Sequence, residues 1–205
     1  MALLDHTLGI MTHPDEEWAA IKKQKSSFRQ VFLSHVPFLA AIPAVASFFG
    51  LTQVGWTIGD GAAVKLTVNS ALSLCALTYV ALLAGVYILG EFINWMAKTY
   101  GVDGSEERRH YAGTAMAVYI TTPLMLAGAV TAYPMLWLDA IVIMAAATYS
   151  VYLIYEGVPI LMSLDKDRAF MYSSSIVTVG LVLMVTAMIA TVIIWGMGLG
   201  PVFAD

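Results

Sequence analysis

The sequence is short of charge, and this shortage excludes a water-soluble body. Only 12% of its 205 residues are charged and 60% are apolar, whereas a soluble domain has about 25% charged and about 45–50% apolar residues. The chain therefore lacks the polar surface that a soluble domain needs. Its net charge of -4 is small and spread along the chain, which predicts neither a nucleic-acid partner nor a polybasic lipid anchor.

Cysteine is also nearly absent, and so are the short motifs of common enzymes. Cys75 is the single cysteine, so no internal disulfide and no thiolate metal site is expected, and we interpret it as a small packing residue. The sequence contains no HExxH, no GxSxG and no Walker phosphate loop. These absences predict a protein that is not an enzyme and that holds no metal or cofactor.

What the sequence does contain is five long apolar runs, each able to cross the roughly 30 Å hydrocarbon core of a bilayer as a helix. They are predicted at residues 31–50, 66–97, 111–132, 135–162 and 173–197. The fold is therefore predicted to be all-α, a polytopic helical membrane bundle of five transmembrane helices. No cleavable signal peptide is expected, because residues 1–30 hold no continuous apolar core.

Residues 1–30 are predicted to carry one amphipathic helix. It would start near Thr12 and run to Phe28, with Trp18 on its apolar face, and would lie at the membrane surface or under the bundle. His6 and His13 are interpreted as solvated residues near its start. A metal site is not expected there, because the two histidines are not spaced i,i+4 and have no cysteine partner.

Nearly all basic residues fall on one side of the predicted bundle. With the N-terminus in the cytoplasm, segments 1–30, 98–110 and 165–168 hold nine of the ten lysines and arginines, and Lys65 alone lies on the other side. Such an excess is typical of cytoplasmic segments. The count therefore predicts a cytoplasmic N-terminus and a periplasmic tail at residues 198–205.

A set of short motifs recurs in a fixed order over nearly the whole chain. They are His13-Pro14-Asp15, Ala40-Ala41-Ile42-Pro43, Thr52-Gln53-Val54-Gly55-Trp56, Gly59-Asp60-Gly61, Tyr133-Pro134 with Trp137-Leu138, Tyr155-x-Gly157-Val158-Pro159 and Ser173-Ser174-Ser175. In this order they resemble the Yip family, the Ypt/Rab-interacting membrane proteins, and its bacterial inner-membrane branch in particular.

The resemblance implies five spans and a cytoplasmic N-terminus, in agreement with the independent count of basic residues. It also implies a multi-pass protein of the bacterial inner (plasma) membrane, whose partners are the lipid bilayer, other membrane proteins or a second copy of the chain. Eukaryotic relatives act in vesicle traffic and bind prenylated small GTPases. The chain lacks the long cytoplasmic N-terminal region of those relatives, which argues against a GTPase partner.

Carboxylates in the apolar runs are the strongest candidates for a site. A charge at mid-bilayer costs roughly 2.5–3.5 kcal/mol on insertion scales, so such a group faces the bundle interior or water. By depth, Glu91 and Glu156 both lie toward the cytoplasmic ends of their spans. We expect them to share a cytoplasm-facing cavity with Asn94, Tyr152 and His35 that binds a cation, a proton or a lipid headgroup. The alternative is structural: each carboxylate reaches the interface or pairs with a helix end.

Two functions follow from these features. The first is a non-enzymatic membrane organiser, a scaffold that binds other membrane proteins or a second copy, as the family resemblance implies. The second is a small transporter or channel for an ion, proton or small solute, with Glu91 and Glu156 along its path. We find no internal repeat of the kind many transporters carry, which favours the organiser. The small-residue step Ala81–Gly85 would let another helix approach closely.

Overall fold

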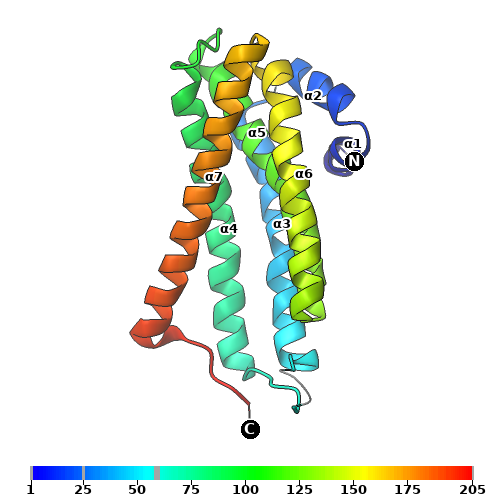
Figure 1. Cartoon of the computed structure of the whole chain (residues 1–205), viewed down its shortest axis with the longest axis vertical. Coiled ribbons are helices and arrows are strands. Elements are labelled where there is room, and N and C mark those ends of the chain that lie inside the picture. The colour runs from blue at the N-terminus through cyan, green and yellow to red at the C-terminus, as the bar shows by residue number, and fades with distance from the viewer. Residues whose placement is uncertain (1, 25, 58–60, 205) are drawn as a thin grey trace.

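Five long helices run along the longest axis of the structure, and successive helices point in opposite directions (Figure 1). The structure is a computed structural model that describes residues 2–24, 26–57 and 61–204. Lys25 and the Gly59-Asp60 part of the predicted turn lie outside these residues. The five helices are α3 (Phe28–Phe49), α4 (Val68–Ala97), α5 (Glu106–Ala127), α6 (Leu136–Met162) and α7 (Lys166–Ile194). All five, with the short turns that extend α3, α5 and α7, are long and apolar enough to cross a membrane.

Polar capping residues mark where three of these helices begin. Ser27, Thr67 and Ser105 precede α3, α4 and α5, and each side chain accepts a hydrogen bond from a backbone N–H in the first turn. α5 consequently starts at Glu106 rather than at 111. α7, which follows Asp165 without a side-chain cap, starts at Lys166 rather than at 173. The charged segments at these points are therefore the first turns of helices and not loops.

The N-terminal segment folds as two short helices, so the single helix predicted to reach Phe28 is wrong. α1 (Ala2–Thr12) and α2 (Pro14–Lys23) meet at His13, whose backbone is not helical. Gln24 is extended and ends α2, and Phe28 belongs to α3. α2 packs against α6, and α1 contacts α2 and α5. The pair therefore lies against the bundle, beside α6 in Figure 1.

α5 is the central helix of the bundle. It packs against α3, α4 and α6, and every residue from Tyr111 to Ile120 is buried. Glycines let α4 approach it closely: a Cβ added to Gly113 would lie 3.0 Å from the backbone nitrogen of Asn94, and one added to Gly90 would lie 3.4 Å from the Cα of Thr114. Small residues of this kind allow close helix contacts inside a membrane.

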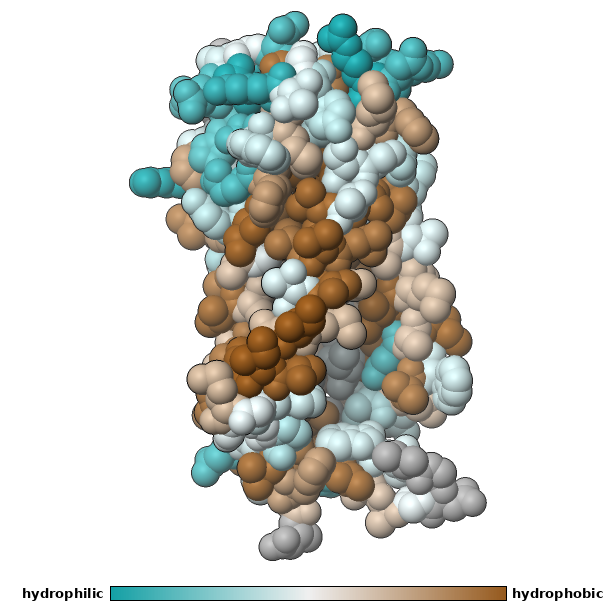
Figure 2. All heavy atoms as spheres, turned by 60° about the vertical axis from the view of Figure 1, so that its left-hand side comes forward, coloured by the Kyte–Doolittle hydropathy of each residue, from teal (hydrophilic) through white to brown (hydrophobic). Residues whose placement is uncertain are grey.

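One end of the bundle carries most of the basic residues, and we call it the basic end. It contains the α2–α3 link, the α4–α5 loop and the turn between α6 and α7. Figure 2 shows hydrophilic side chains gathered there, at the top, and hydrophobic side chains along the middle of the molecule. The opposite end holds the α3–α4 loop and the C-terminal tail, together with the short turns η1 (Gly50–Val54), η2 (Gly128–Ala132) and η3 (Trp195–Leu199).

α7 packs tightly against the bundle near the basic end and loosely beyond it, whereas α3 packs closely on η2 at the opposite end. The buried residues of α7 all lie in its first eleven residues, between Ala169 and Ile176. Toward its C-terminal end the helix diverges from α4, as Figure 1 shows. The tail then turns back at Gly198 (φ 94°). The carbonyl of Val202 accepts a hydrogen bond from the backbone N–H of Thr67 at the start of α4, and the N–H of Ala204 donates to the carbonyl of Lys65. α7 is thus held to the bundle at its two ends.

Candidate functional site

Glu91, one of the predicted site residues, pairs with a histidine of the central helix. Its carboxylate lies 2.8 Å from Nε2 of His110 in the first turns of α5. The His110 ring stacks on Phe28 with 4.1 Å between centroids, and the Arg29 guanidinium lies 5.8 Å from the centre of the Phe28 ring. Glu91 therefore belongs to a partly buried cluster that joins the basic ends of α3, α4 and α5.

His35, the predicted proton site, is buried and fully hydrogen-bonded. Its Nδ1 lies 3.1 Å from the carbonyl of Val31, and its Nε2 lies 3.2 Å from the hydroxyl of Tyr119. A carbonyl only accepts, so Nδ1 carries the proton of the neutral ring and Nε2 accepts the O–H of Tyr119. This geometry holds α3 against α5.

The other three predicted residues lie in separate environments. Asn94 packs against Gly113 on α5. Tyr152 is 47% exposed, and its ring lies 5.6 Å from that of Tyr149. Glu156 is half-buried on α6, and none of the recorded ion pairs or hydrogen bonds among the described residues involves its side chain.

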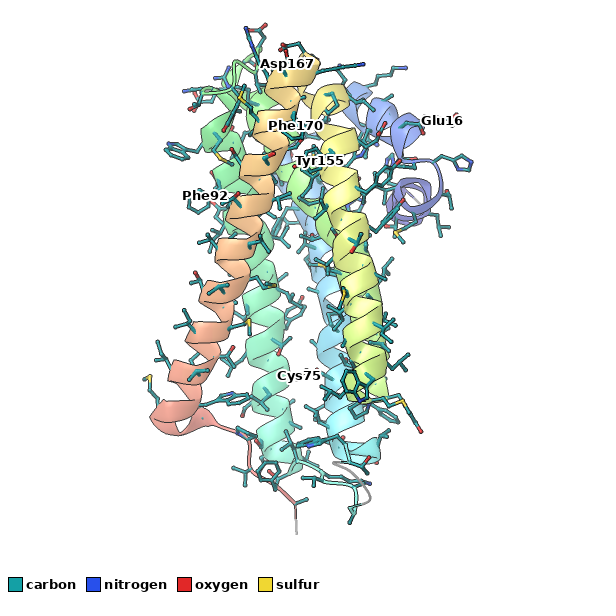
Figure 3. The ribbon with its side chains drawn as sticks, in the orientation of Figure 1. Glu16, Cys75, Phe92, Tyr155, Asp167 and Phe170 are labelled. Carbon is teal, nitrogen blue, oxygen red and sulfur yellow. The ribbon has the colours of Figure 1, made fainter. Side chains whose placement is uncertain are left out.

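The structure does not bring the five residues into one cavity. α4 and α6 each pack against α5, and they are not among the helix pairs that pack closely with each other. Phe92 and Tyr155, the neighbours of Glu91 and Glu156, are both in the upper part of the bundle in Figure 3, but on different helices. The two carboxylates thus lie toward the same end on helices that α5 joins. A ligand at either one stays a prediction.

A polar and aromatic cluster lies between α1, α2 and the bundle, and the sequence did not predict it. His6, interpreted as solvated, contacts Glu17 with one ring nitrogen and Gln24 with the other. The side chains of His6 and Glu17 are only 15% and 17% exposed. The His6 ring also meets Tyr119 edge-on at 6.0 Å. His13, in contrast, is exposed, as expected.

Trp18 anchors these N-terminal helices. It is completely buried and meets the ring of Tyr119 edge-on at 6.1 Å. A Cβ added to Gly157 of α6 would lie 2.5 Å from Cε2 of Trp18, so the indole occupies space that only glycine leaves open. The hydroxyl of Tyr111 reinforces the contact by donating to the carbonyl of Ile21 at 2.8 Å. The one signal in the sequence was a glycine within an otherwise bulky stretch of α6.

An open cavity of about 1090 Å³ lies next to this anchor at the basic end. The end of α2, the α2–α3 link, the first turns of α3 and α5 and the end of α6 border it. Its lining includes Lys22, Lys23 and Arg108, and none of the five predicted site residues. Among the described residues, no group of three or more His, Cys, Asp or Glu side chains is placed to hold a metal ion.

Comparison with known proteins gives a consistent family match. The family model of the Yip1 domain matches residues 8–198. The chain is 37% identical over 196 residues to the inner membrane protein YohC of Escherichia coli strain K12, covering 95% of this chain and 98% of the relative. YohC of Escherichia coli O6:H1 strain CFT073 matches to the same extent. No solved structure matches the chain.

Proposed function

This chain belongs to the Yip1 domain family and is a multi-pass inner-membrane protein, and from that premise we propose that it acts as a non-enzymatic membrane organiser. In this role it is a scaffold that holds other membrane proteins, or a second copy of itself, against its own helices. The basic end faces the cytoplasm, as the excess of lysine and arginine there indicates. The C-terminal tail then lies in the periplasm.

The observation that carries the proposal is the exposure of the outer part of α7, residues 184–193. Every residue from 184 to 193 is exposed, beginning with the four neighbours Met184, Val185, Thr186 and Ala187. A helix of 3.6 residues per turn points four such neighbours in widely different directions. Val177, Val179 and Leu183, nearer the basic end, still pack against the core. Residues 184–193, in contrast, present exposed side chains on all sides of the helix to another membrane protein.

Small residues make the exposed helices suited to close contact. No atom of the described residues lies within 4 Å of a Cβ added to Gly180 on α7 or to Gly85 on α4. Gly90 and Gly113, in contrast, are in use within the bundle. Apolar surface alone drives no association in lipid, where close packing at small residues does. The unused glycines therefore offer sites at which a further helix can pack.

A site-specific photocrosslinker tests this proposal in native membranes. Placed at Val182 of α7, it should yield adducts of one or a few discrete masses, which identify a second copy or another membrane protein. Placed at Ile141, a similarly exposed residue of α6 that is 66% accessible, it should yield none of them. Gly180→Leu, at a position where an added Cβ has no atom of the described residues within 4 Å, should weaken the adducts from position 182. Equal labelling from both positions would contradict the proposal.

The same protein, reconstituted into liposomes, separates scaffolding from transport. A scaffold should pass no more ions or protons than empty liposomes. A flux that disappears in both Glu91→Gln and Glu156→Gln, with normal membrane levels of the variants, would instead support the transporter expected as the alternative.

A further inference from the structure

The cavity at the basic end collects positive charge with little to neutralise it. Lys22 and Lys23 reach it from the last turn of α2, and Arg108 reaches it from the first turn of α5. Glu107 is the one acid among the described residues that line it. Among the described residues, none of the three basic side chains forms an ion pair. Three cations around one space repel each other, and an anion between them removes that repulsion.

Helix ends of both signs border the cavity, so the positive potential rests mainly on the three basic side chains. The last turns of α2 and α6 bring partly negative C-terminal ends, and α3 and α5 bring the opposite ends. Ser27 and Ser105, the residues that cap α3 and α5, both line the cavity. Each therefore brings the partly positive N-terminal end of a long helix to its edge. Side chains with hydrogen-bonding capacity, including Gln24 and Tyr111, complete the polar part. The ligand that fits this part carries negative charge on several oxygen atoms.

The remaining wall of the cavity is apolar. Pro159, Ile160 and Leu161 from the last turns of α6 form it, together with Ala112 of α5. A free inorganic anion would contact only the basic part of the lining. An amphiphile would contact the basic part with its charged headgroup and the apolar part with its hydrocarbon chains. The volume of about 1090 Å³ is at the upper limit of ordinary ligand pockets, which measure about 300–1,000 Å³, and it is open to the surroundings.

We propose that this cavity binds the phosphate headgroup of an anionic phospholipid. The phosphate lies between Lys22, Lys23 and Arg108, and the acyl chains leave along the apolar end of α6. The lipid comes from the leaflet at the basic end. Basic pockets between transmembrane helices on the cytoplasmic side are suited to such headgroups. The site is separate from the exposed half of α7 and does not depend on the scaffold role.

The test uses the full-length protein in detergent, titrated with short-chain phosphatidylglycerol and followed by native mass spectrometry. Short-chain phosphatidylcholine serves as the zwitterionic comparison. Each basic residue near a phosphate should contribute about fivefold to affinity, so Lys22→Gln/Lys23→Gln/Arg108→Gln together should weaken phosphatidylglycerol binding on the order of a hundredfold. The single variant Arg108→Lys keeps the charge and should bind nearly as well as the wild type.

The matched control changes three basic residues of the same end that lie outside the cavity lining: Lys98→Gln/Lys166→Gln/Arg168→Gln. It should retain most of the affinity. An equal loss in both triple variants would overturn the proposal, because it would mean binding to surface charge in general. Inorganic phosphate should not displace the lipid. Displacement by millimolar phosphate, or equal binding of phosphatidylcholine, would likewise overturn the assignment to an anionic lipid.

Discussion

Gly157→Ala should loosen the N-terminal helices while leaving the membrane spans intact. The added methyl group would lie 2.5 Å from Cε2 and 2.8 Å from Nε1 of Trp18, closer than side-chain carbons approach one another. Because the new methyl group is attached to the backbone of α6, it cannot move away, and the indole must move instead. Because Trp18 is completely buried and holds α2 against α6, its displacement lifts α2 from the bundle.

The size of the effect follows from two opposing terms. Overpacking a core typically costs about 1–3 kcal/mol, and a contact this short belongs at the upper end. Gly-to-Ala exchange in a helix also stabilises that helix by up to about 1 kcal/mol. Gly180→Ala on α7 has the second term alone, since nothing lies within 4 Å of its new methyl. Relative to this control, Gly157→Ala should destabilise the docking of α2 by about 3 kcal/mol, or roughly a hundredfold in the population of the open form.

Hydrogen exchange of residues 14–23 in nanodiscs measures that population. These amides should exchange up to about a hundredfold faster in Gly157→Ala than in Gly180→Ala, and the amides of α5 should be unchanged. In a Trp18→Ala background the methyl group has room, so Gly157→Ala should then have little further effect. Equal exchange of α2 in the two single variants would refute the claim that the indole occupies the space at Gly157.

Three further predictions concern contacts that hold the elements of the bundle together. Gly113→Ala should lower thermal stability in detergent by about 1–3 kcal/mol, whereas Gly85→Ala, whose methyl group meets nothing, should not. Tyr119→Phe leaves Nε2 of the buried His35 without its donor and should cost about 1–3 kcal/mol in equilibrium unfolding. Deletion of residues 201–205 removes the backbone hydrogen bonds between the C-terminal tail and the α3–α4 loop. Spin-label distances between the start of α4 and the end of α7 should then become longer and more widely distributed.

The five spans could be predicted because burial in lipid demands long apolar runs, which a sequence shows directly. The starts of α5 and α7 could not, because hydropathy marks what lies in lipid and not what is helical. Glu106, Glu107 and Lys166 are helical yet charged. The clue to α5 was Ser105, which caps it, followed by two acids that favour the positive end of a helix dipole.

The shared cavity expected around Glu91 and Glu156 was misjudged for a different reason. Counting residues from the helix ends placed Glu91 and Glu156 toward the same end, which gives depth but not direction around the bundle. Direction depends on which helix is central, and α5 became central through close contacts at Gly90 and Gly113. The N-terminal anchor depends on the fit of Trp18 to Gly157, two residues far apart in the chain. Neither contact leaves a periodic pattern in the sequence.

The basic end of the bundle is tightly packed, whereas the outer part of α7 is not, and this difference follows from their polar contacts. Tyrosine hydroxyls near the basic end reach across to the backbones of other elements: Tyr111 to Ile21, Tyr149 to Ile10 and Tyr172 to Ile93. Threonines in the outer part of α7, at positions 178, 186 and 191, bond only to carbonyls of their own helix. Cross-helix hydrogen bonds and small-residue contacts hold helices together in lipid. Among the described residues, these threonines form no such bond to another helix, which explains why this part of α7 stands apart from the bundle.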